Sequence, residues 1–430
     1  MQVKELFVPL RQHLASKLQR RIRNILVTAL LFCAVTTFVA CRPQYDVVPA
    51  QDTSGFTART RHTMEAFGTI SVLRLYDDFS LEENVARFEA TWRQVVDVLA
   101  QLDDIFSLNR QDTELARFNA LVYGESMEIS YHMAQVIKIA QEAYEKTGGL
   151  FDPSVFPLVD LWGFSSRFNT NRFVPQLPYD RPEGRGALPH EDYIEAFRQL
   201  VNFSGIVLSG NQAEGYQLAK MIPPVVVNGV AYQAQLDFGA LLKGYAVDLV
   251  HAILMEAGFS YGFFSCGGSS IVFLRGIVEE NNHQIEVNLR KPRPGQGGGS
   301  SFARVYLSQV SISTSGDYDH AFFLDGIRYS HVFDPRTGRP IHPPQNGVQE
   351  GVASATVIGP SGVQTEAIST ALLVMSLEEA RAFVSQNLDY QMVLVYVKNT
   401  RDYFEVMHNM PQGSIVFLDS AFVEVGLHQE

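Results

Sequence analysis

Cysteine is scarce in this sequence, with 3 among 430 residues, at Cys33, Cys41 and Cys266. No pair has the C-x-x-C spacing of a cysteine zinc site, and three cysteines are too few for a disulfide framework. Any bound metal must therefore be held mainly by oxygen or nitrogen. Positive charge is also in deficit, because 34 Lys and Arg face 46 Asp and Glu, for a net charge of -12. This balance argues against a broad surface for nucleic-acid phosphates, so we expect no nucleic-acid partner.

The apolar stretch near the N-terminus is too short to span a membrane. Residues 25–40 (ILVTALLFCAVTTFVA) carry no charge and follow a basic stretch. These 16 residues fall short of the roughly 20 that a spanning helix needs. A cleaved export signal is therefore favoured over a permanent transmembrane helix.

The end of this stretch, Phe38-Val39-Ala40-Cys41, resembles a bacterial lipobox in which Phe38 replaces the usual Leu. We expect residues 1–40 to be a lipoprotein signal peptide, Cys41 to be acylated with chains such as palmitate, and residues 41–60 to form a polar tether. The mature chain would then be periplasmic and lipid-anchored to the bacterial inner membrane. The alternative is an ordinary buried cysteine in a longer export signal.

The rest of the chain mixes helical and strand patterns, without internal repeats. Apolar residues from Val85 to Phe106 recur at spacings of three and four, which predicts an amphipathic helix. The sequence also predicts helices at about 132–147 and 242–257, each followed by glycine, and strands at 70–76, 392–397 and 414–418. Local strands between helices favour the α+β class. We expect one compact catalytic region over residues 61–430, with Pro/Gly-rich surface excursions at about 165–190 and 292–301.

The first segment with chemical potential is LDFGALLKGYAVD, residues 236–248. An acid and a glycine at the end of a predicted strand lead into a helix that carries Lys243 on its first turn. Free N–H groups at a helix N-terminus beside one lysine favour a phosphate. The G-x-x-x-x-G-K order of a Walker A loop is missing. A glycine turn with a solvated lysine is the alternative interpretation.

The second segment, residues 313–340, gathers His331, Asp334, Arg336 and Thr337 at a predicted strand-to-turn transition. Such a turn can aim an acid/base and a phosphate-holding guanidinium into one cleft. A hydrogen-bonded surface turn is the alternative.

The third segment, residues 365–375, is a predicted helix start in which Glu366 and Thr370 share a face. A carboxylate and a hydroxyl so placed can bind a hard cation such as Mg2+. The alternative is an acid that complements the helix dipole and a threonine that packs in the core.

In this order the three segments resemble the ApbE family, the FAD:protein FMN transferases. The family motifs D-x-G-x-x-x-K-G-y-a-v-D, T-S-G-d, H-x-x-D-P-r-T-G and D-a-x-x-T correspond here to residues 237–248, 314–317, 331–338 and 366–370. Further similarities are Phe67-Gly68-Thr69, Phe106-Ser107 with Thr113-Glu114-Leu115 and Asn119, Phe151 to Leu158, Trp162-Gly163-Phe164 and Cys266-Gly267-Gly268. The resemblance covers about residues 64–400 and implies the T-fold-related architecture of the family.

The resemblance implies an exported, often lipid-anchored enzyme that binds FAD and uses Mg2+ to move FMN onto a threonine hydroxyl of a partner protein, with AMP leaving. Subunits of membrane redox pumps are the partners it suggests. The metal would be held by the Ala240 carbonyl, Glu366 and Thr370. Catalytic roles would fall to His331, as the base, and to Lys243. The positions implied for FAD contact are Phe67, Asn109, Leu150, Phe151, Asp152, Asp237, Lys243, His331 and Val332.

Two positions depart from the family pattern. Glu366 stands where Asp is usual, and Asn109 stands where an aromatic ring commonly follows F-S-x. Without that ring, water could replace threonine, which gives a Mg2+-dependent FAD pyrophosphatase as an alternative function. A non-enzymatic lipoprotein that carries FAD is the alternative if Glu366 does not hold the metal.

Overall fold

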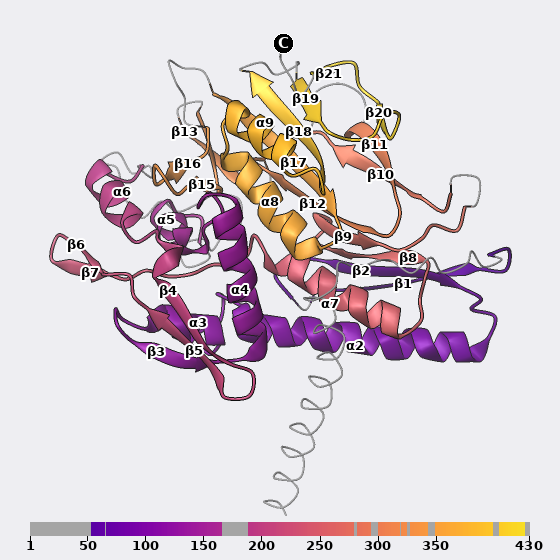
Figure 1. Ribbon diagram of the computed structural model, residues 1–430, viewed down its shortest axis with the longest axis horizontal. Coiled ribbons are helices and arrows are strands. Elements are labelled where there is room, and N and C mark those ends of the chain that lie inside the picture. The colour runs from indigo at the N-terminus through magenta and orange to yellow at the C-terminus, as the bar shows by residue number, and fades with distance from the viewer. Residues whose placement is uncertain are drawn as a thin grey trace, which may run out of the picture.

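The computed structural model describes the chain in nine stretches (Figure 1). These are residues 53–64, 66–165, 188–278, 282–293, 300–318, 320–324, 327–342, 349–398 and 404–425. The predicted signal peptide and Cys41 lie outside the described residues. Most of the two Pro/Gly-rich stretches also lie outside them. No helix in the described residues is long and apolar enough to cross a membrane.

One large sheet organises the described residues. Its nine strands run in the order β1-β2-β8-β9-β12-β17-β18-β19-β21. Neighbours pair antiparallel except β19 and β21, which pair in parallel. The strands are β1 Thr57–Thr63, β2 Ser71–Asp77, β8 Gly262–Cys266, β9 Ser270–Phe273, β12 Val310–Gly316, β17 Glu350–Gly359, β18 Gln391–Lys398, β19 Phe404–His408 and β21 Phe422–Glu424. This largely antiparallel sheet, combined with helices, confirms the α+β class.

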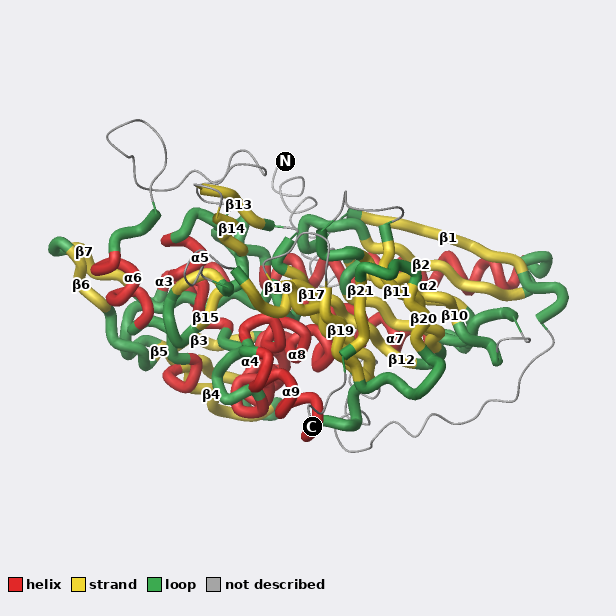
Figure 2. Tube along the Cα trace, turned by 90° about the horizontal axis from the view of Figure 1, so that it is seen from above, coloured by secondary structure: helices red, strands yellow, loops and turns green. Residues whose placement is uncertain are grey.

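Helices cover one face of this sheet and a small sheet covers the other (Figures 1 and 2). The helices near the sheet are α2 Glu82–Phe106, α4 Tyr131–Lys146, α7 Leu242–Glu256, α8 Gly362–Val374 and α9 Leu377–Gln386. The small sheet consists of β10 Ile285–Arg290, β11 Ser301–Leu307 and β20 Ile415–Phe417. Alternate side chains of the central strands pack into two separate apolar cores, one on each face.

A smaller region lies beside α4 and the C-terminal end of α2 (Figure 1). It holds the sheet β3-β5-β4 and the hairpin β6-β7. Its elements are α3 Glu114–Ala120, β3 Ser126–Ile129, η1 Pro153–Val155, α5 Phe156–Leu161, α6 Glu191–Arg198, η2 Phe203–Gly205, β4 Ile206–Asn211, β5 Gly215–Lys220, β6 Val225–Val227 and β7 Val230–Tyr232. Two further hairpins are β13 Ala321–Leu324 with β14 Ile327–Ser330, and β15 Phe333–Asp334 with β16 Arg339–Pro340.

The three helices and three strands predicted from the sequence are confirmed. Helix α2 buries the expected stripe, with Phe88, Leu99 and Leu102 fully covered. Helix α4 is followed by two glycines, and Gly149 has a φ of 83°. Helix α7 is followed by Gly258, with a φ of 78°. Positive φ at these positions is the left-handed conformation that ends a helix and that glycine adopts without strain.

The structure corrects two expectations. The predicted tether 41–60 extends too far, because residues 57–60 belong to β1, whose Thr57 to Thr63 pair along their whole length with β2. The polar residues of this segment, which include Arg59 and Arg61, suit an exposed edge strand, where charge discourages further pairing. Asp237 does not end a strand, because β7 stops at Tyr232 and residues 233–238 are irregular.

Candidate functional site

The candidate site lies where α7 and α8 cross at glycine. A Cβ atom on Gly244 of α7 would lie 2.2 Å from the carbonyl oxygen of Gly362, the first residue of α8. Only a residue without a side chain permits this approach, so the two helices meet backbone to backbone. Glu366 lies one turn further along α8 and therefore faces the first turn of α7.

Asp248 fixes this crossing from the α7 side. Its carboxylate accepts hydrogen bonds from the Ser361 hydroxyl at 2.8 Å and from the N–H groups of Gly362 and Val363 at 2.6 and 3.1 Å. It therefore caps α8, although it belongs to α7. Burial raises the pKa of Asp248 to about 6, against the effect of these three donors. The sequence motif contains Asp248 but gives no indication that it caps a second helix.

Glu366 is the buried carboxylate at the centre of the site, with 3% of its surface exposed. Its Oε2 accepts a hydrogen bond from the N–H of Gly244 at 2.6 Å. Its Oε1 forms an ion pair with Lys243. Burial disfavours the charge on Lys243, but the adjacent Glu366 carboxylate outweighs it and the pKa of this lysine is raised. The Nζ atom of Lys243 also donates to the Gly239 carbonyl at 2.8 Å.

The Ala240 carbonyl lies just before the first turn of α7. Gly244 is the third residue of α7, so its N–H is one of the first-turn groups that have no acceptor within the helix, and Glu366 accepts from it. Within the described residues no hydrogen bond reaches the Ala240 oxygen. Thr370 follows Glu366 by one turn and is half-buried. The three predicted metal ligands therefore combine a carbonyl, a carboxylate and a hydroxyl, the oxygen donors that Mg2+ prefers.

Carboxylates and histidines alone do not supply such a site. No group of three or more His, Cys, Asp or Glu in the described part of the chain is arranged to hold a metal. A cation at this crossing would depend on the Ala240 carbonyl and the Thr370 hydroxyl as much as on Glu366. The Lys243 ammonium, held between Glu366 and Gly239, already brings positive charge to this place.

The irregular segment before α7 is held rigidly by an asparagine. Asn119 donates to the Leu236 carbonyl at 2.9 Å and accepts from the Leu236 N–H at 2.7 Å, as a neighbouring strand would. Asp237, next in the chain, accepts from the Gly239 N–H at 2.7 Å. Burial raises the pKa of Asp237, opposed by this bond and by nearby Lys243.

Two glycine-containing loops approach the same lysine. A Cβ atom on Gly267 would lie 3.0 Å from the Thr69 hydroxyl and 3.4 Å from Cδ of Lys243. Phe67 has a φ of 57°, and its N–H donates to Asp103 of α2 at 3.2 Å. The structure thus brings the predicted F-G-T and C-G-G segments together with Lys243. Neighbouring Cys266 is buried, which raises the pKa of its thiol to about 11.

The other positions implied for FAD differ in what they present. Asn109 lies exposed in the turn that follows α2. Asp152 is buried and its carboxylate accepts from Ser154 at 2.8 Å and from the Phe203 N–H at 3.4 Å. This carboxylate therefore caps η1, while Phe151 packs in the core and Leu150 remains half-buried.

His331 lies at the predicted strand-to-turn transition, directly after β14. Its Nδ1 is 3.0 Å from the carbonyl oxygen of His320, and the two rings meet edge to face. Val332 follows and pairs through its carbonyl with the Ile341 N–H. A carbonyl at Nδ1 holds the proton there and makes Nε2 the basic nitrogen.

The turn after His331 is fastened to α8 and α9. Arg336 pairs with Asp334 at 2.8 Å and with Glu379 at 2.8 Å, and it donates to the Val374 carbonyl at 3.2 Å. Its guanidinium is thus engaged by two carboxylates, not poised for phosphate as the sequence suggested. Trp162 donates to the Gly338 carbonyl at 3.2 Å, which ties the W-G-F motif to the same turn.

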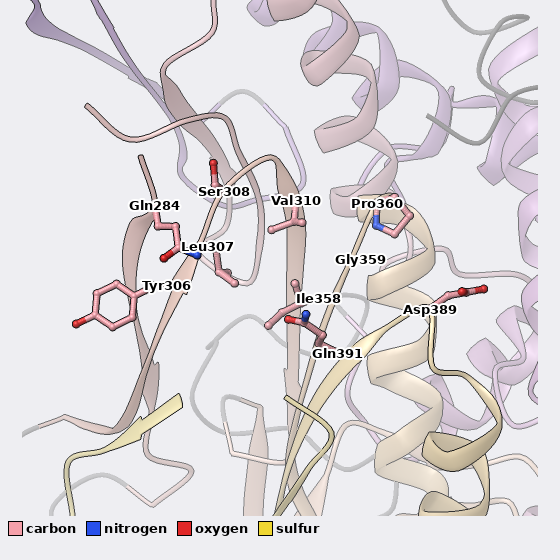
Figure 3. Close-up of a pocket in the computed structure, with 10 residues that line it drawn as sticks. All are labelled: Gln284, Tyr306, Leu307, Ser308, Val310, Ile358, Gly359, Pro360, Asp389 and Gln391. Atoms are coloured by element: carbon pink, nitrogen blue, oxygen red, sulfur yellow. The ribbon is translucent and has the colours of Figure 1, made fainter. Parts of the chain in front are cut away.

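A pocket of about 290 Å³ lies at the other end of β12 (Figure 3). Its lining includes Val310 at the start of this strand, Gly359 at the end of β17, and Tyr306. Ser315 lies toward the opposite end of β12, whereas the α7–α8 crossing lies beside Ser313, whose hydroxyl is 3.5 Å from the Gly362 carbonyl. The pocket shares no residue with the predicted site.

Fold and site together define an α+β protein in which two crossing helices pair a buried carboxylate, Glu366, with the half-buried Lys243. The ApbE family model matches residues 67–394, and the chain belongs to the ApbE family. The FAD:protein FMN transferase of Vibrio cholerae is 29% identical over 308 residues, 72% of this chain and 79% of that protein. The Escherichia coli (strain K12) FAD:protein FMN transferase is 29% identical over 282 residues, 66% of this chain and 70% of that protein.

The fold agrees with this assignment. The solved structure of the flavin transferase ApbE from Vibrio cholerae matches with a TM-score of 0.63 and 26% sequence identity. The match covers 82% of this chain and 97% of that structure. The architecture expected from the sequence motifs is therefore confirmed.

Proposed function

We propose that this protein is an FAD:protein FMN transferase that requires Mg2+, accepts a threonine hydroxyl of a partner protein and releases AMP. The relatives named above are FAD:protein FMN transferases by name, which supports the transfer of FMN from FAD to a protein. The observation that supports the proposal is the buried Glu366 carboxylate, which is held at the first turn of α7 by the Gly244 N–H and Lys243, while the Ala240 carbonyl just before this turn accepts no hydrogen bond within the described residues. Transfer of a phosphoryl-linked group depends chiefly on charge neutralisation and positioning, which such a site supplies.

Each residue then has a task. Ala240, Glu366 and Thr370 would hold Mg2+, which supplies charge neutralisation at the pyrophosphate of FAD. Lys243 is held at its Nζ by the Gly239 carbonyl and adds a second positive charge beside Glu366. Asp237 and the loops around Phe67 and Gly267 would line the nucleotide site.

His331 would act as the base. Because Nδ1 is directed to the His320 carbonyl, Nε2 is the nitrogen that can take the proton of an incoming hydroxyl. The threonine Oγ–phosphorus bond forms to the FMN phosphate while the pyrophosphate P–O bond breaks, and AMP leaves with the electron pair. The proton is held on His331 and passes to solvent or AMP afterwards.

We further propose that the protein is a lipoprotein, anchored through acylated Cys41 to the periplasmic side of the bacterial inner membrane. The lipobox-like end of the N-terminal apolar stretch supports this location. A threonine-bearing subunit of a membrane redox pump, close to the same surface, would be a fitting acceptor.

Hydrolysis of FAD to FMN and AMP is a second candidate activity, favoured by Asn109. This exposed amide follows α2, at the position where the family pattern commonly has an aromatic ring that would shield the nucleotide. Water could then replace the threonine hydroxyl at the same site.

The test is incubation of the purified protein with FAD, Mg2+ and a threonine-bearing target, followed by mass spectrometry and nucleotide analysis. A target that gains FMN supports the transferase, free FMN with AMP supports the pyrophosphatase, and intact FAD contradicts both. We predict that Glu366→Gln abolishes AMP release and leaves FAD binding weakened but present. Glu378→Gln, an exposed carboxylate on α9, is the matched control and should retain activity. Full activity of Glu366→Gln with a chelator present would overturn the metal assignment.

A further inference from the structure

Three hydroxyl groups and a carbonyl form a closed ring between β12 and α8. Ser315 of β12 lies 2.8 Å from the Ser369 hydroxyl and 3.2 Å from the Thr370 hydroxyl. Ser369 and Thr370 each lie within hydrogen-bond distance of the Glu366 carbonyl, at 2.9 and 3.2 Å. The ring therefore joins the backbone of one proposed metal ligand, Glu366, to the side chain of another, Thr370.

Proton counting gives this ring a direction. Four oxygen–oxygen contacts share only three hydroxyl protons, since each hydroxyl donates once. The two shortest contacts are Ser369 to the Glu366 carbonyl and Ser315 to Ser369, and shorter contacts hold the better hydrogen bonds. A carbonyl cannot donate, so Ser369 donates its proton to the Glu366 carbonyl. Ser315 must then be the donor to Ser369.

Thr370 is then left as a donor only. Its proton goes to Ser315 or to the Glu366 carbonyl, both at 3.2 Å, and no hydroxyl of the ring donates to its oxygen. Both lone pairs of that oxygen stay available to a cation. If Ser315 donated to Thr370 instead, one lone pair would be occupied.

We infer that Ser315 and Ser369 are positioning residues that keep the Thr370 hydroxyl oriented as a metal ligand. Ser369 accepts the proton of Ser315, so that this proton does not point at the Thr370 oxygen. Ser315 in turn is an acceptor for the proton of Thr370. This inference rests on the proposed function, because Mg2+ at Thr370 is part of that proposal. Neighbours of this kind orient a ligand, and their removal typically weakens metal binding about 10- to 100-fold.

Ser313 provides an internal control. It lies two residues before Ser315 on the same face of β12, and its hydroxyl lies 3.0 Å from that of Thr365 on α8. It bridges the same strand to the same helix, but it does not touch Thr370. Loss of Ser313 therefore removes a docking contact without changing the ring.

The experiment measures Mg2+ binding to the purified, metal-free protein by calorimetry, with Mn2+ resonance spectra as a second readout. FAD binding in chelator and the melting temperature are recorded for each variant. We expect Ser315→Ala and Ser369→Ala each to raise the Kd for Mg2+ by about 10-fold or more. Ser313→Ala should change it less than about threefold, and FAD binding in chelator should stay near wild type in all three.

The double variant separates orientation from simple damage. In Ser369→Ala, Ser315 loses its acceptor and turns its proton to the Thr370 oxygen. Removal of Ser315 as well removes that competing donor, so the double variant should bind Mg2+ no more weakly than Ser369→Ala. If Ser369→Ala does not fold, Ser369→Cys, similar in size but a weak acceptor, replaces it with the same expectation.

Wild-type Mg2+ affinity in either single variant, an equal loss in Ser313→Ala, or multiplied losses in the double variant would overturn the inference alone. Failure of the wild-type protein to bind Mg2+ would overturn the proposed metal site and this inference with it.

Discussion

At the scale of single residues, the extra methylene of Glu366 has a visible consequence. The carboxylate reaches both the Gly244 N–H and the Lys243 ammonium of the facing helix. A buried carboxylate needs such partners, because an unpaired charge in the interior is strongly destabilising. The same reach lets Glu366 accept from a first-turn N–H of α7 that has no acceptor within its own helix.

Asn109 is the residue at which the balance of activities can be tested. We predict that Asn109→Tyr binds FAD more tightly by about 0.5–1.5 kcal/mol, or about 2- to 12-fold in Kd, because a ring can stack on the nucleotide. FAD hydrolysis without a protein acceptor should be measurable in wild type and slower in this variant. Fluorescence titration and AMP release are the measurements.

Asn109→Gln retains an amide without a ring and serves as the control, with FAD affinity expected near that of wild type. Equal affinity and equal hydrolysis in Asn109→Tyr and wild type would show that position 109 does not face the nucleotide.

At the scale of elements, the α7–α8 crossing determines the site. We predict that Gly244→Ala lowers the free energy of unfolding by about 1–3 kcal/mol, because the new Cβ would meet the Gly362 carbonyl. Helix propensity alone would favour alanine by about 1 kcal/mol, so a loss identifies the contact between helices. Urea denaturation measures the change, and Mg2+ affinity should fall as Glu366 moves from Gly244.

Gly55→Ala is the control for this substitution, because no heavy atom lies within 4 Å of its Cβ position. Its stability should stay within about 0.5 kcal/mol of wild type. A Gly244→Ala protein of wild-type stability would contradict the backbone-to-backbone crossing.

The contact between α4 and α7 gives the protein a pH dependence. His132 of α4 is buried, with Nδ1 2.9 Å from the Tyr245 hydroxyl of α7, and burial lowers its pKa to about 4. The folded state binds fewer protons than the unfolded state, whose histidine has a pKa near 6.5. Stability from this group is therefore full above about pH 6.5 and is lost as pH falls toward 4.

We predict that wild type loses about 3 kcal/mol more than His132→Gln between pH 7 and pH 4, since glutamine does not titrate and still offers Tyr245 an acceptor. Urea denaturation at several pH values measures this difference. His251, whose pKa burial also lowers to about 4, is present in both proteins and cancels. Parallel pH profiles would contradict the buried, neutral state of His132.

At the scale of the whole molecule, charge and attachment are linked. Removal of residues 1–40 would take away six positive charges and one negative charge, which would change the net charge from -12 to -17. Such a chain would be repelled by anionic lipid, so the proposed anchoring would depend on the acyl chains. We predict that Cys41→Ser releases the protein from membranes or leaves the signal uncleaved, as fractionation and intact mass would show.

Cys33→Ser, inside the apolar stretch, is the control and should mature and fractionate like wild type. If Cys41→Ser does the same, the lipoprotein assignment is wrong.

The sequence by itself determined the family, the α+β class, and the elements with strong local patterns. The apolar stripe of α2 and the glycines after α4 and α7 are local signals, because side-chain spacing and backbone freedom act over a few residues. The placement of Glu366 and Thr370 one turn apart also followed from helical geometry alone. Helix α8 lacks a comparable stripe, since it is buried on nearly every side between the sheet and α7.

Only the tertiary structure decided how these residues meet. The Gly244–Gly362 approach, the hydrogen bond from Gly244 to Glu366 and the pairing of Lys243 with Glu366 join residues more than a hundred positions apart. The Ser315 ring likewise depends on which face of β12 meets α8. Contacts of this kind arise from the packing of whole elements against one another. The residues that meet are far apart in the chain, so no local sequence pattern predicts them. Arg336 is a further example. The sequence suggested that its guanidinium could bind phosphate, but in the structure it pairs with Glu379 of α9, which is 43 residues away in the chain.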